Sequence, residues 1–214
     1  LVYKAASQLQ QRANRQAGCH ITLEKNIPIG GGLGGGSSDA ATTLLALNKL
    51  WKLKLELNEL CAIGKNLGAD VPVFIHGYSA WGEGIGEQLS PISIPDRHYL
   101  IIKPNCYITT KDLYQHSQLN RNSKKINRKE YQVGMGHNDF EPLAAKLKPE
   151  IKAALNWLSQ HGKARLTGSG ACLFATFDTY EEATRIAKIA PKKWLAITTK
   201  GCNKSPVKRL LEQD

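Results

Sequence analysis

The stretch that decides the fold spans residues 28–41 and reads PIGGGLGGGSSDAA. Six glycines surround a single leucine, and the run leads directly into a helix-forming segment, AATTLLALNKLW, at residues 40–51. Glycine lets the backbone adopt positive φ angles and approach a ligand closely. The amides of such a loop and the N-terminus of the following helix together favour an anion. We therefore expect a phosphate-binding loop here rather than a plain flexible turn.

Two common phosphate loops fit this stretch poorly. A Walker A loop requires a lysine and then Ser or Thr after its last glycine, whereas Gly36 is followed directly by serine. The dinucleotide-binding pattern GxGxxG is matched by Gly30, Gly32 and Gly35, but a run of glycines matches it by chance. In addition, Pro28 separates the loop from the preceding apolar segment. We therefore expect neither a P-loop nor a Rossmann fold.

Hydrophobic periodicity, capping residues and turn residues predict the elements on either side of the loop. Ser37, Ser38 and Asp39 are expected to cap the helix that follows the loop. Residues 117–137 are polar and are expected to form a mobile loop or a weak helix. The predicted helices are 1–17, 58–68 with Asn58 as N-cap, 141–161, 180–189 after a capping box at Thr179, and about 205–212; the predicted strands are 19–25, 99–102, two pieces within 166–177, and 194–199; residues 76–95 read as a hairpin.

The order of these elements predicts an α+β protein of two lobes. The segment 90–96, SPISIPD, marks a crossing between them. We expect an ATP-binding lobe at residues 1–95 and a second lobe at 96–214, the latter similar to a split β-α-β unit of the ferredoxin-like kind. The chain lacks an initiator Met and starts within a helical pattern, so we also expect its N-terminal part to be missing.

Composition excludes several classes of protein. The 214 residues are 42% hydrophobic and 22% charged, which is typical of a globular protein. No run of about 18 apolar residues is present, so no membrane span is expected. Scattered thiols of this kind suit a reducing cytoplasm, and the absence of CxxC or Cys/His spacing argues against a zinc site and a disulfide framework. The five cysteines are Cys19, Cys61, Cys106, Cys172 and Cys202.

The net charge of +11 is concentrated in the second half of the chain. Residues 96–214 hold 21 Lys and Arg against 11 Asp and Glu, whereas residues 1–95 hold 8 against 7. A basic half can attract nucleic acid or a polyphosphate ligand. The basic residues do not alternate with aromatic ones and no RNA- or DNA-binding signature is present, so a nucleic-acid-binding module is the weaker hypothesis.

The loop and three further segments resemble the GHMP kinases, a superfamily of small-molecule kinases. In most members the loop reads Pro-x-x-x-Gly-Leu-Gly-Ser-Ser, and the triple glycine before Ser-Ser-Asp-Ala-Ala is typical of one branch. That branch uses ATP to phosphorylate the 2-hydroxyl of a cytidine diphosphate derivative of methylerythritol, in non-mevalonate isoprenoid synthesis. The three further segments follow in the order of the family: LGADVPVF at 67–74, NDFE at 138–141 and LTGSGAC at 166–172.

The resemblance implies a two-lobed GHMP kinase fold with an N-terminal lobe like ribosomal protein S5, incomplete here, and a ferredoxin-like C-terminal lobe. Asp70 matches the catalytic aspartate of the family, which orients or deprotonates the acceptor hydroxyl; a plain helix cap is the alternative from the residues alone. The first-strand lysine of the family has no counterpart, and Lys4 does not replace it, so we expect this chain to be inactive or nearly so. The ATP-binding residues implied are Pro28, Ile29, Gly30, Gly31, Gly32, Leu33, Gly34, Gly35, Gly36, Ser37 and Ser38.

The resemblance also implies where the acceptor and the metal lie. Tyr114 would stack on the cytosine ring and Thr110 would contact the diphosphate, although an ordinary half-buried tyrosine is the alternative. Residues Gly168, Ser169 and Gly170 would border the donor phosphates or form only a turn. Magnesium is expected with ATP. No cluster of carboxylates or histidines indicates a metal site, so no ligand residue is assigned.

A different GHMP kinase, acting on mevalonate, homoserine or a sugar, is the nearest alternative. The triple glycine and the segment 67–74 favour the cytidine-diphosphate branch. In either case the expected partner is a small molecule rather than a nucleic acid or a membrane, and the oligomeric state is not predicted.

Overall fold

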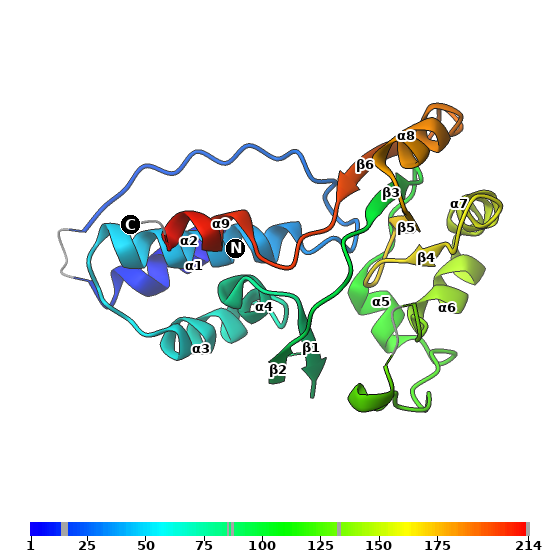
Figure 1. Cartoon of the computed structure of the whole chain (residues 1–214). Helices are drawn as coiled ribbons and strands as arrows, with labels where there is room; N and C mark the ends of the chain where they lie inside the picture. The colour runs from blue at the N-terminus through cyan, green and yellow to red at the C-terminus, as the bar shows by residue number, and fades with distance from the viewer. Residues whose placement is uncertain (14–16, 85, 87, 132–133, 213–214) are drawn as a thin grey trace. The chain divides into compact units, whose positions relative to one another are not determined.

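A computed structural model describes residues 1–13, 17–84, 86, 88–131 and 134–212. By their contacts the residues form two compact units (Figure 1). The domain boundary expected between residues 95 and 96 stays a prediction, because two short segments group across it. Unit 1 comprises Leu1–Asn26, Gly34–Ile94 and Cys202–Asp214; unit 2 comprises Ile27–Leu33 and Pro95–Gly201.

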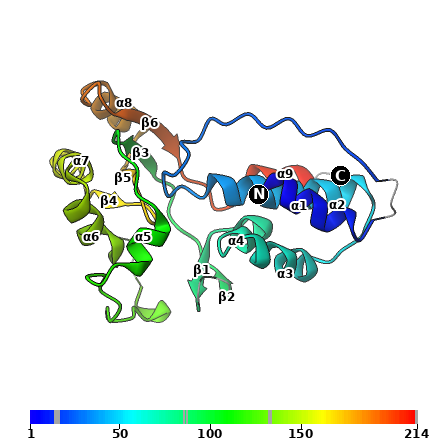
Figure 2. The ribbon, with the colours of Figure 1, turned by 180° about the vertical axis from the view of Figure 1, so that it is seen from behind.

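Unit 1 is built from helices and one hairpin. Its helices bury a single apolar cluster. Helix α2 contributes Ala40, Leu44 and Leu47, which are spaced so that they lie on one face of the helix. The helices α1 and α2 lie side by side in both views (Figures 1 and 2). The elements are α1 (Val2–Gln10), α2 (Gly35–Leu50), α3 (Leu57–Leu67), α4 (Val71–His76), β1 (Ala80–Glu83), β2 (Gln88–Pro91) and α9 (Pro206–Leu211).

Several predicted boundaries in unit 1 are wrong. The first helix ends at Gln10 rather than at residue 17, because Leu9 is its last buried side chain and polar residues follow; residues 14–16 of that prediction lie outside the described residues. The N-cap of α3 is Glu56, which forms a reciprocal capping box with Glu59, instead of Asn58.

The strand predicted at 19–25 is extended but unpaired. No backbone hydrogen bond joins residues 19–25 to another described segment. A β-strand requires a hydrogen-bonded neighbouring strand. The alternation of apolar and polar residues in this segment therefore predicted its extended backbone correctly, but it did not predict whether a neighbouring strand is present. The side chains of Ile21 and Leu23 are 39% and 48% exposed. Figure 2 shows the segment as a long extended run that leads towards α2.

The end of the chain completes unit 1. The Ser79 N–H donates to the Asn203 carbonyl at 3.0 Å, and the Ser205 N–H donates to the Gly77 carbonyl at 2.8 Å. The Asn203 side chain also bonds both backbone groups of Ile94, at 2.9 and 2.7 Å. Residues 202–212 therefore pair with the segment that follows α4, and the hairpin predicted in 76–95 is present as β1 and β2.

Unit 2 contains a four-stranded antiparallel sheet of order β4-β5-β3-β6. Leu100 and Ile102 of the central strand β3 are fully buried, and α7 and α8 pack against the sheet. The helix predicted at 141–161 is two helices, because Pro149 starts a new one after Lys148. The elements are β3 (His98–Lys103), α5 (Thr110–Gln115), η1 (Arg128–Glu130), α6 (Phe140–Leu147), α7 (Pro149–Ser159), β4 (Arg165–Leu166), β5 (Leu173–Phe177), α8 (Tyr180–Lys188) and β6 (Leu195–Lys200).

The local predictions for unit 2 agree with these elements. Thr179 caps α8 by accepting a hydrogen bond from the Glu182 N–H at 3.1 Å, and the two predicted strand pieces are β4 and β5. Segment 117–131 contains only the short η1 helix among its described residues. No helix in the described ranges combines the length and apolar composition that crossing a bilayer requires.

Candidate functional site

In unit 2 the glycine loop lies on the turn between β4 and β5. This turn, residues 167–172, includes Gly168, Ser169 and Gly170, which were predicted to border the donor phosphates or to form only a turn. Three consecutive loop carbonyls accept hydrogen bonds from it at 2.8 to 3.2 Å: Gly30 from the Ala171 N–H, Gly31 from the Cys172 N–H, and Gly32 from Thr167 Oγ1.

These contacts occupy the carbonyls of the loop and leave its amides unengaged. Within the described part of the chain, no group accepts a hydrogen bond from the N–H of Gly30, Gly31 or Gly32. Unengaged backbone amides in a glycine loop are the donors that a phosphate group requires. The loop can therefore offer these donors to a phosphate, and its ATP-binding role stays a prediction.

Gly32 is the position where the loop and the turn approach most closely. Its φ is +71°, and a Cβ added there would lie 2.2 Å from the Thr167 carbonyl oxygen and 2.9 Å from the Gly170 nitrogen. Any larger residue would separate the loop from the turn, because the opposing atoms are backbone. This explains why at least one glycine of the run is obligatory.

Two exposed apolar side chains flank the loop in unit 2. Ile29 is 77% exposed and Tyr107 is 60% exposed, and the ring of Tyr107 covers Gly30 so closely that a Cβ there would lie 2.4 Å from Cε2. The sequence analysis missed Tyr107. Its signal would have been an aromatic residue two positions before the predicted substrate segment at 109–114.

The predicted acceptor residues lie on or beside α5. Thr110 Oγ1 and Ser169 Oγ are 2.6 Å apart, so the structure brings together two of the predicted site residues. Tyr114 is 58% exposed and makes an edge contact with Phe140, with the ring centroids 4.9 Å apart. Tyr114 is therefore partly exposed, and its stacking on a base stays a prediction beside the ordinary half-buried tyrosine.

In unit 1 the second half of the glycine stretch forms the start of α2. Gly34 is the N-cap in a left-handed conformation, with φ of +68°, and no side chain caps the helix. The expectation that Ser37, Ser38 and Asp39 cap this helix is wrong, because the glycines themselves form its first turn. The first-turn amides are consequently not satisfied by a side chain, and a helix N-terminus in this state favours an anion.

An ion pair that the sequence analysis missed lies beside this helix start. Lys25 Nζ is 2.5 Å from Asp39 Oδ2, and both side chains are about three-quarters buried, at 29% and 24% exposure. The pair joins the extended segment to α2. In the sequence, the only signal for this ion pair is that residues 25 and 39 carry opposite charges. Many residue pairs carry opposite charges without forming an ion pair, so this signal is not specific.

Asp70 lies at the N-cap of α4, but its side chain makes no capping hydrogen bond and is exposed. The turn before it reaches α2, because a Cβ on Gly68 would lie 3.8 Å from Ser37 Oγ. The helix after it reaches the end of the loop, because a Cβ on Gly34 would lie 2.8 Å from the ring of Phe74. Within unit 1, residues on either side of Asp70 therefore contact the first turn of α2, and the exposed Asp70 carboxylate makes no capping bond; its catalytic role stays a prediction.

Cys172 lies directly under the loop, where a Cβ on Gly31 would be 2.7 Å from its Sγ. Burial raises the pKa of the Cys172 thiol to about 11, and the Lys103 ammonium only partly opposes this effect. The thiol is therefore neutral near pH 7 and a poor nucleophile. The geometry gives it a packing role.

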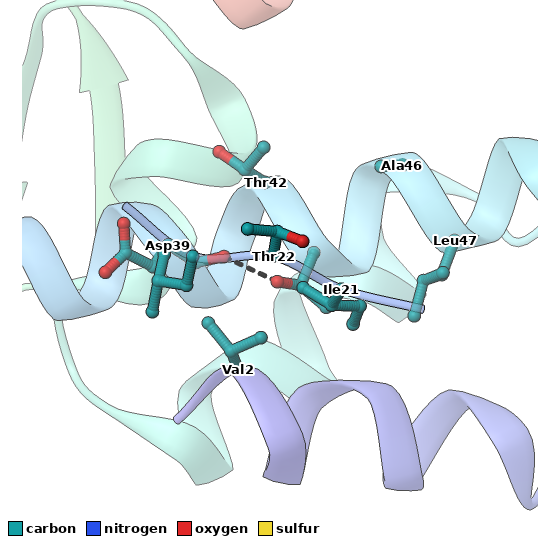
Figure 3. Close-up of a pocket in the computed structure, with 9 residues that line it drawn as sticks. Val2, Ile21, Thr22, Asp39, Thr42, Ala46 and Leu47 are labelled. Carbon is teal, nitrogen blue, oxygen red and sulfur yellow. Dashed lines mark hydrogen bonds between the residues drawn. The ribbon is translucent and has the colours of Figure 1, made fainter. Parts of the chain in front are cut away.

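Neither a metal cluster nor the pocket in Figure 3 adds to this site. Among the described residues, no group of three or more His, Cys, Asp and Glu side chains could hold a metal. The pocket lies in unit 1 between α1, α2 and the extended segment, and Figure 3 shows Asp39 as its one carboxylate among aliphatic and threonine side chains. Such a lining suits apolar groups rather than a nucleoside phosphate.

Comparison with known proteins matches both parts of the chain to one superfamily. The family described as GHMP kinases N terminal domain matches residues 1–78, and GHMP kinases C terminal matches residues 117–196. Among curated relatives, the 4-diphosphocytidyl-2-C-methyl-D-erythritol kinase of Tolumonas auensis is 44% identical over 213 residues, which is 100% of this chain and 75% of that protein. The kinase of the same name from Nitrosococcus oceani is 45% identical, over 100% of this chain and 76% of that protein.

Solved structures give a graded likeness. A crystal structure of 4-(cytidine 5'-diphospho)-2C-methyl-D-erythritol kinase has a TM-score of 0.79 and 32% identity, covering 94% of this chain and 78% of that one. Homoserine kinase from Cytophaga hutchinsonii has a TM-score of 0.61 at 18% identity, covering 95% and 76% of the two chains. The second likeness shows the fold alone.

Proposed function

The chain belongs to the GHMP kinase family, as its motifs predicted, and we propose that it transfers the γ-phosphoryl group of ATP to the 2-hydroxyl of 4-diphosphocytidyl-2-C-methyl-D-erythritol. This reaction belongs to isoprenoid precursor synthesis. The observation that carries the proposal is the glycine loop, whose amides at Gly30, Gly31 and Gly32 are engaged by no described group.

The donor side of the reaction is argued from the loop. Phosphoryl transfer depends on positioning and on stabilising charge more than on covalent help from the protein. The amides of Gly30, Gly31 and Gly32 would hold the phosphates of ATP. Their donors are fixed by the backbone, so they cost little reorganisation as charge develops on the transferring group.

On the acceptor side, Asp70 would accept the proton of the attacking hydroxyl or hold that proton in line. The 2-hydroxyl is tertiary and crowded, so its alignment decides the rate. A carboxylate without an intramolecular hydrogen bond is available for this task, and one that caps a helix is not. Tyr114, with its exposed ring, would stack on cytosine, and Thr110 would contact the diphosphate beside Ser169, within the turn Gly168–Gly170.

Magnesium would reach the site with ATP and neutralise charge on its phosphates. The described residues form no three-ligand cluster, so the protein would offer at most hydroxyl contacts, with Ser37 and Ser38 in the first turns of α2 as candidates. This donor set suits an ion held mainly by the phosphates. All five cysteines are free, which supports a reducing, cytoplasmic location.

Other GHMP kinases are the competing function, and no observation favours one of them. The homoserine and mevalonate kinases match this chain at 17 to 18% identity, which is a likeness of fold. The named relatives at 43 to 45% identity share one substrate name.

The test is a single-turnover assay with excess protein and γ-labelled ATP, using this acceptor beside mevalonate, homoserine and galactose. Excess protein makes the labelled product of a single turnover measurable even where turnover is slow. The Tolumonas auensis relative is the positive control. We expect label only on the cytidine diphosphate acceptor. Transfer to another acceptor, or none while the control is active, would contradict the proposal.

A further inference from the structure

The segment NDFE, residues 138–141, holds the turn on which the glycine loop lies. Asn138 Nδ2 donates to the Leu166 carbonyl at 3.0 Å and to the Gly168 carbonyl at 2.7 Å. These two carbonyls lie on either side of Thr167. The Leu166 N–H in turn donates to Glu141 Oε2 at 2.6 Å. Two side chains from one short segment thus fix the backbone before and after Thr167.

Thr167 passes this constraint to the loop. Its Oγ1 donates to the Gly32 carbonyl, and its own carbonyl accepts a hydrogen bond from the Gly170 N–H at 2.8 Å. A small rotation of Thr167 would break the first bond and open the turn that holds Gly30 and Gly31. The orientation of Asn138 is itself fixed, because its Oδ1 accepts the Phe140 N–H at 3.0 Å.

We propose that Asn138 and Glu141 are positioning residues for the ATP loop. By holding the turn at Leu166 and Gly168, they keep the loop carbonyls occupied by the turn, so that the loop amides stay free for phosphate. This inference rests on one part of the proposed function, namely that ATP is the ligand of the loop, and it does not depend on which acceptor is phosphorylated. Neither residue touches the nucleotide in this scheme; both act through Thr167 and the turn.

The same segment also reaches the acceptor side. Phe140, between the two positioning residues, makes the edge contact with the Tyr114 ring. One segment of four residues therefore touches both the turn under the donor loop and the aromatic ring proposed for cytosine. A change confined to Phe140 is expected to affect the acceptor and not ATP, which separates the two roles.

The experiment compares Asn138→Asp with Asn48→Asp in the full 214-residue chain. Aspartate keeps the shape and the acceptor of asparagine and loses its donors. Asn48 is a matched control, because it is also half-buried and its amide bonds both backbone groups of Leu55 at 3.0 Å, far along α2 from the loop. ATP affinity is measured by calorimetry, and amide exchange at Ala171 and Cys172 is measured by mass spectrometry.

We expect Asn138→Asp to weaken ATP binding at least tenfold and to speed exchange at Ala171 and Cys172, while Asn48→Asp changes neither, even if both lower the thermal midpoint. Glu141→Ala, which removes the acceptor of the Leu166 N–H, is expected to weaken ATP binding in the same direction. Unchanged ATP binding in a folded Asn138→Asp protein, or an equal loss in Asn48→Asp, would overturn the inference.

Two further measurements distinguish a failure of this inference from a failure of the proposed function. If Asn138→Asp does not fold, Thr167→Val removes the hydroxyl that bonds Gly32 and must produce the same loss of ATP affinity. If the parent phosphorylates a different acceptor, the proposed substrate is wrong while the ATP arms still decide this inference. If the parent binds no ATP, exchange at Ala171 and Cys172 decides it, and unchanged exchange in Asn138→Asp overturns it.

Discussion

Asp70 is the residue whose role a single substitution can decide. The Asp70 side chain makes no capping hydrogen bond, so Asp70→Asn leaves the start of α4 intact and removes only the base. We expect the single-turnover rate to fall roughly 100-fold or more, the usual range for losing a general base, with ATP affinity nearly unchanged.

The control for this prediction is Asp96→Asn. Asp96 is an exposed carboxylate that pairs with Lys200 at 3.1 Å, and its removal should leave the rate within a factor of two or so, because exposed ion pairs contribute little. A rate for Asp70→Asn that matches this control would mean that the Asp70 carboxylate plays no part in the transfer.

At the scale of elements, the contact between the glycine loop and the β4–β5 turn depends on Gly32. In Gly32→Ala a methyl group would meet backbone at 2.2 Å, and the left-handed conformation adds about 1–2 kcal/mol. We expect the loop to leave the turn and ATP affinity to fall at least tenfold. Calorimetric titration with ATP measures this.

Gly162→Ala is the comparison, since a Cβ there meets only ordinary contacts, the nearest being Ala175 Cβ at 3.5 Å. That variant is expected to bind ATP as the parent does. Equal affinities for the two variants would show that the seating of the loop at Gly32 does not matter for nucleotide binding.

The contact between α4 and α9 predicts a dependence of stability on pH. Burial, and then the nearby Lys208 ammonium, lower the pKa of His76 below its ordinary value of 6.5. Folding therefore favours the neutral imidazole. Its contribution to stability is present above pH 6.5 and is lost as the pH falls through the lower value in the folded state.

We expect the thermal midpoint to decrease between pH 7.5 and pH 5, and to decrease less in His76→Gln, which cannot take up the proton. Differential scanning fluorimetry across this range measures both slopes. Parallel slopes for the two proteins would assign the acid sensitivity to other groups.

The sequence predicted features that depend on residues close together in the chain, and it did not predict features that depend on contacts between distant segments. The Thr179 cap and the strand–turn–strand at 166–177 depend on neighbouring residues, so local pattern was sufficient. The start of α2, the Lys25–Asp39 pair and the Asn138 contacts depend on which distant segments meet. For the same reason the residues of the candidate site could be named from the family motif, while their roles stay predictions.

At the scale of the whole molecule, the extended segment 17–26 offers an accessible backbone to a protease. Its residues 19–25 make no backbone hydrogen bond to another described segment, and Ile21 and Leu23 are exposed. We expect limited digestion with thermolysin to cut first at these residues, before any cut in the strands of unit 2, because a protease requires an extended and accessible backbone. Mass spectrometry of the first fragments locates the cut, and a first cut in β3 or β5 would contradict this prediction.

The pairing of residues 202–212 with Gly77 and Ser79 has a consequence for biosynthesis. A ribosome finishes residues 1–94 long before it reaches residue 202, and at about 5–20 residues per second the interval is roughly 5–20 s. During that time the nascent unit 1 lacks α9, whereas nearly all of unit 2 emerges as one continuous piece. The usual N-terminal-first order of co-translational folding is therefore reversed here, and unit 1 can be completed only after nearly all of unit 2 has been synthesised.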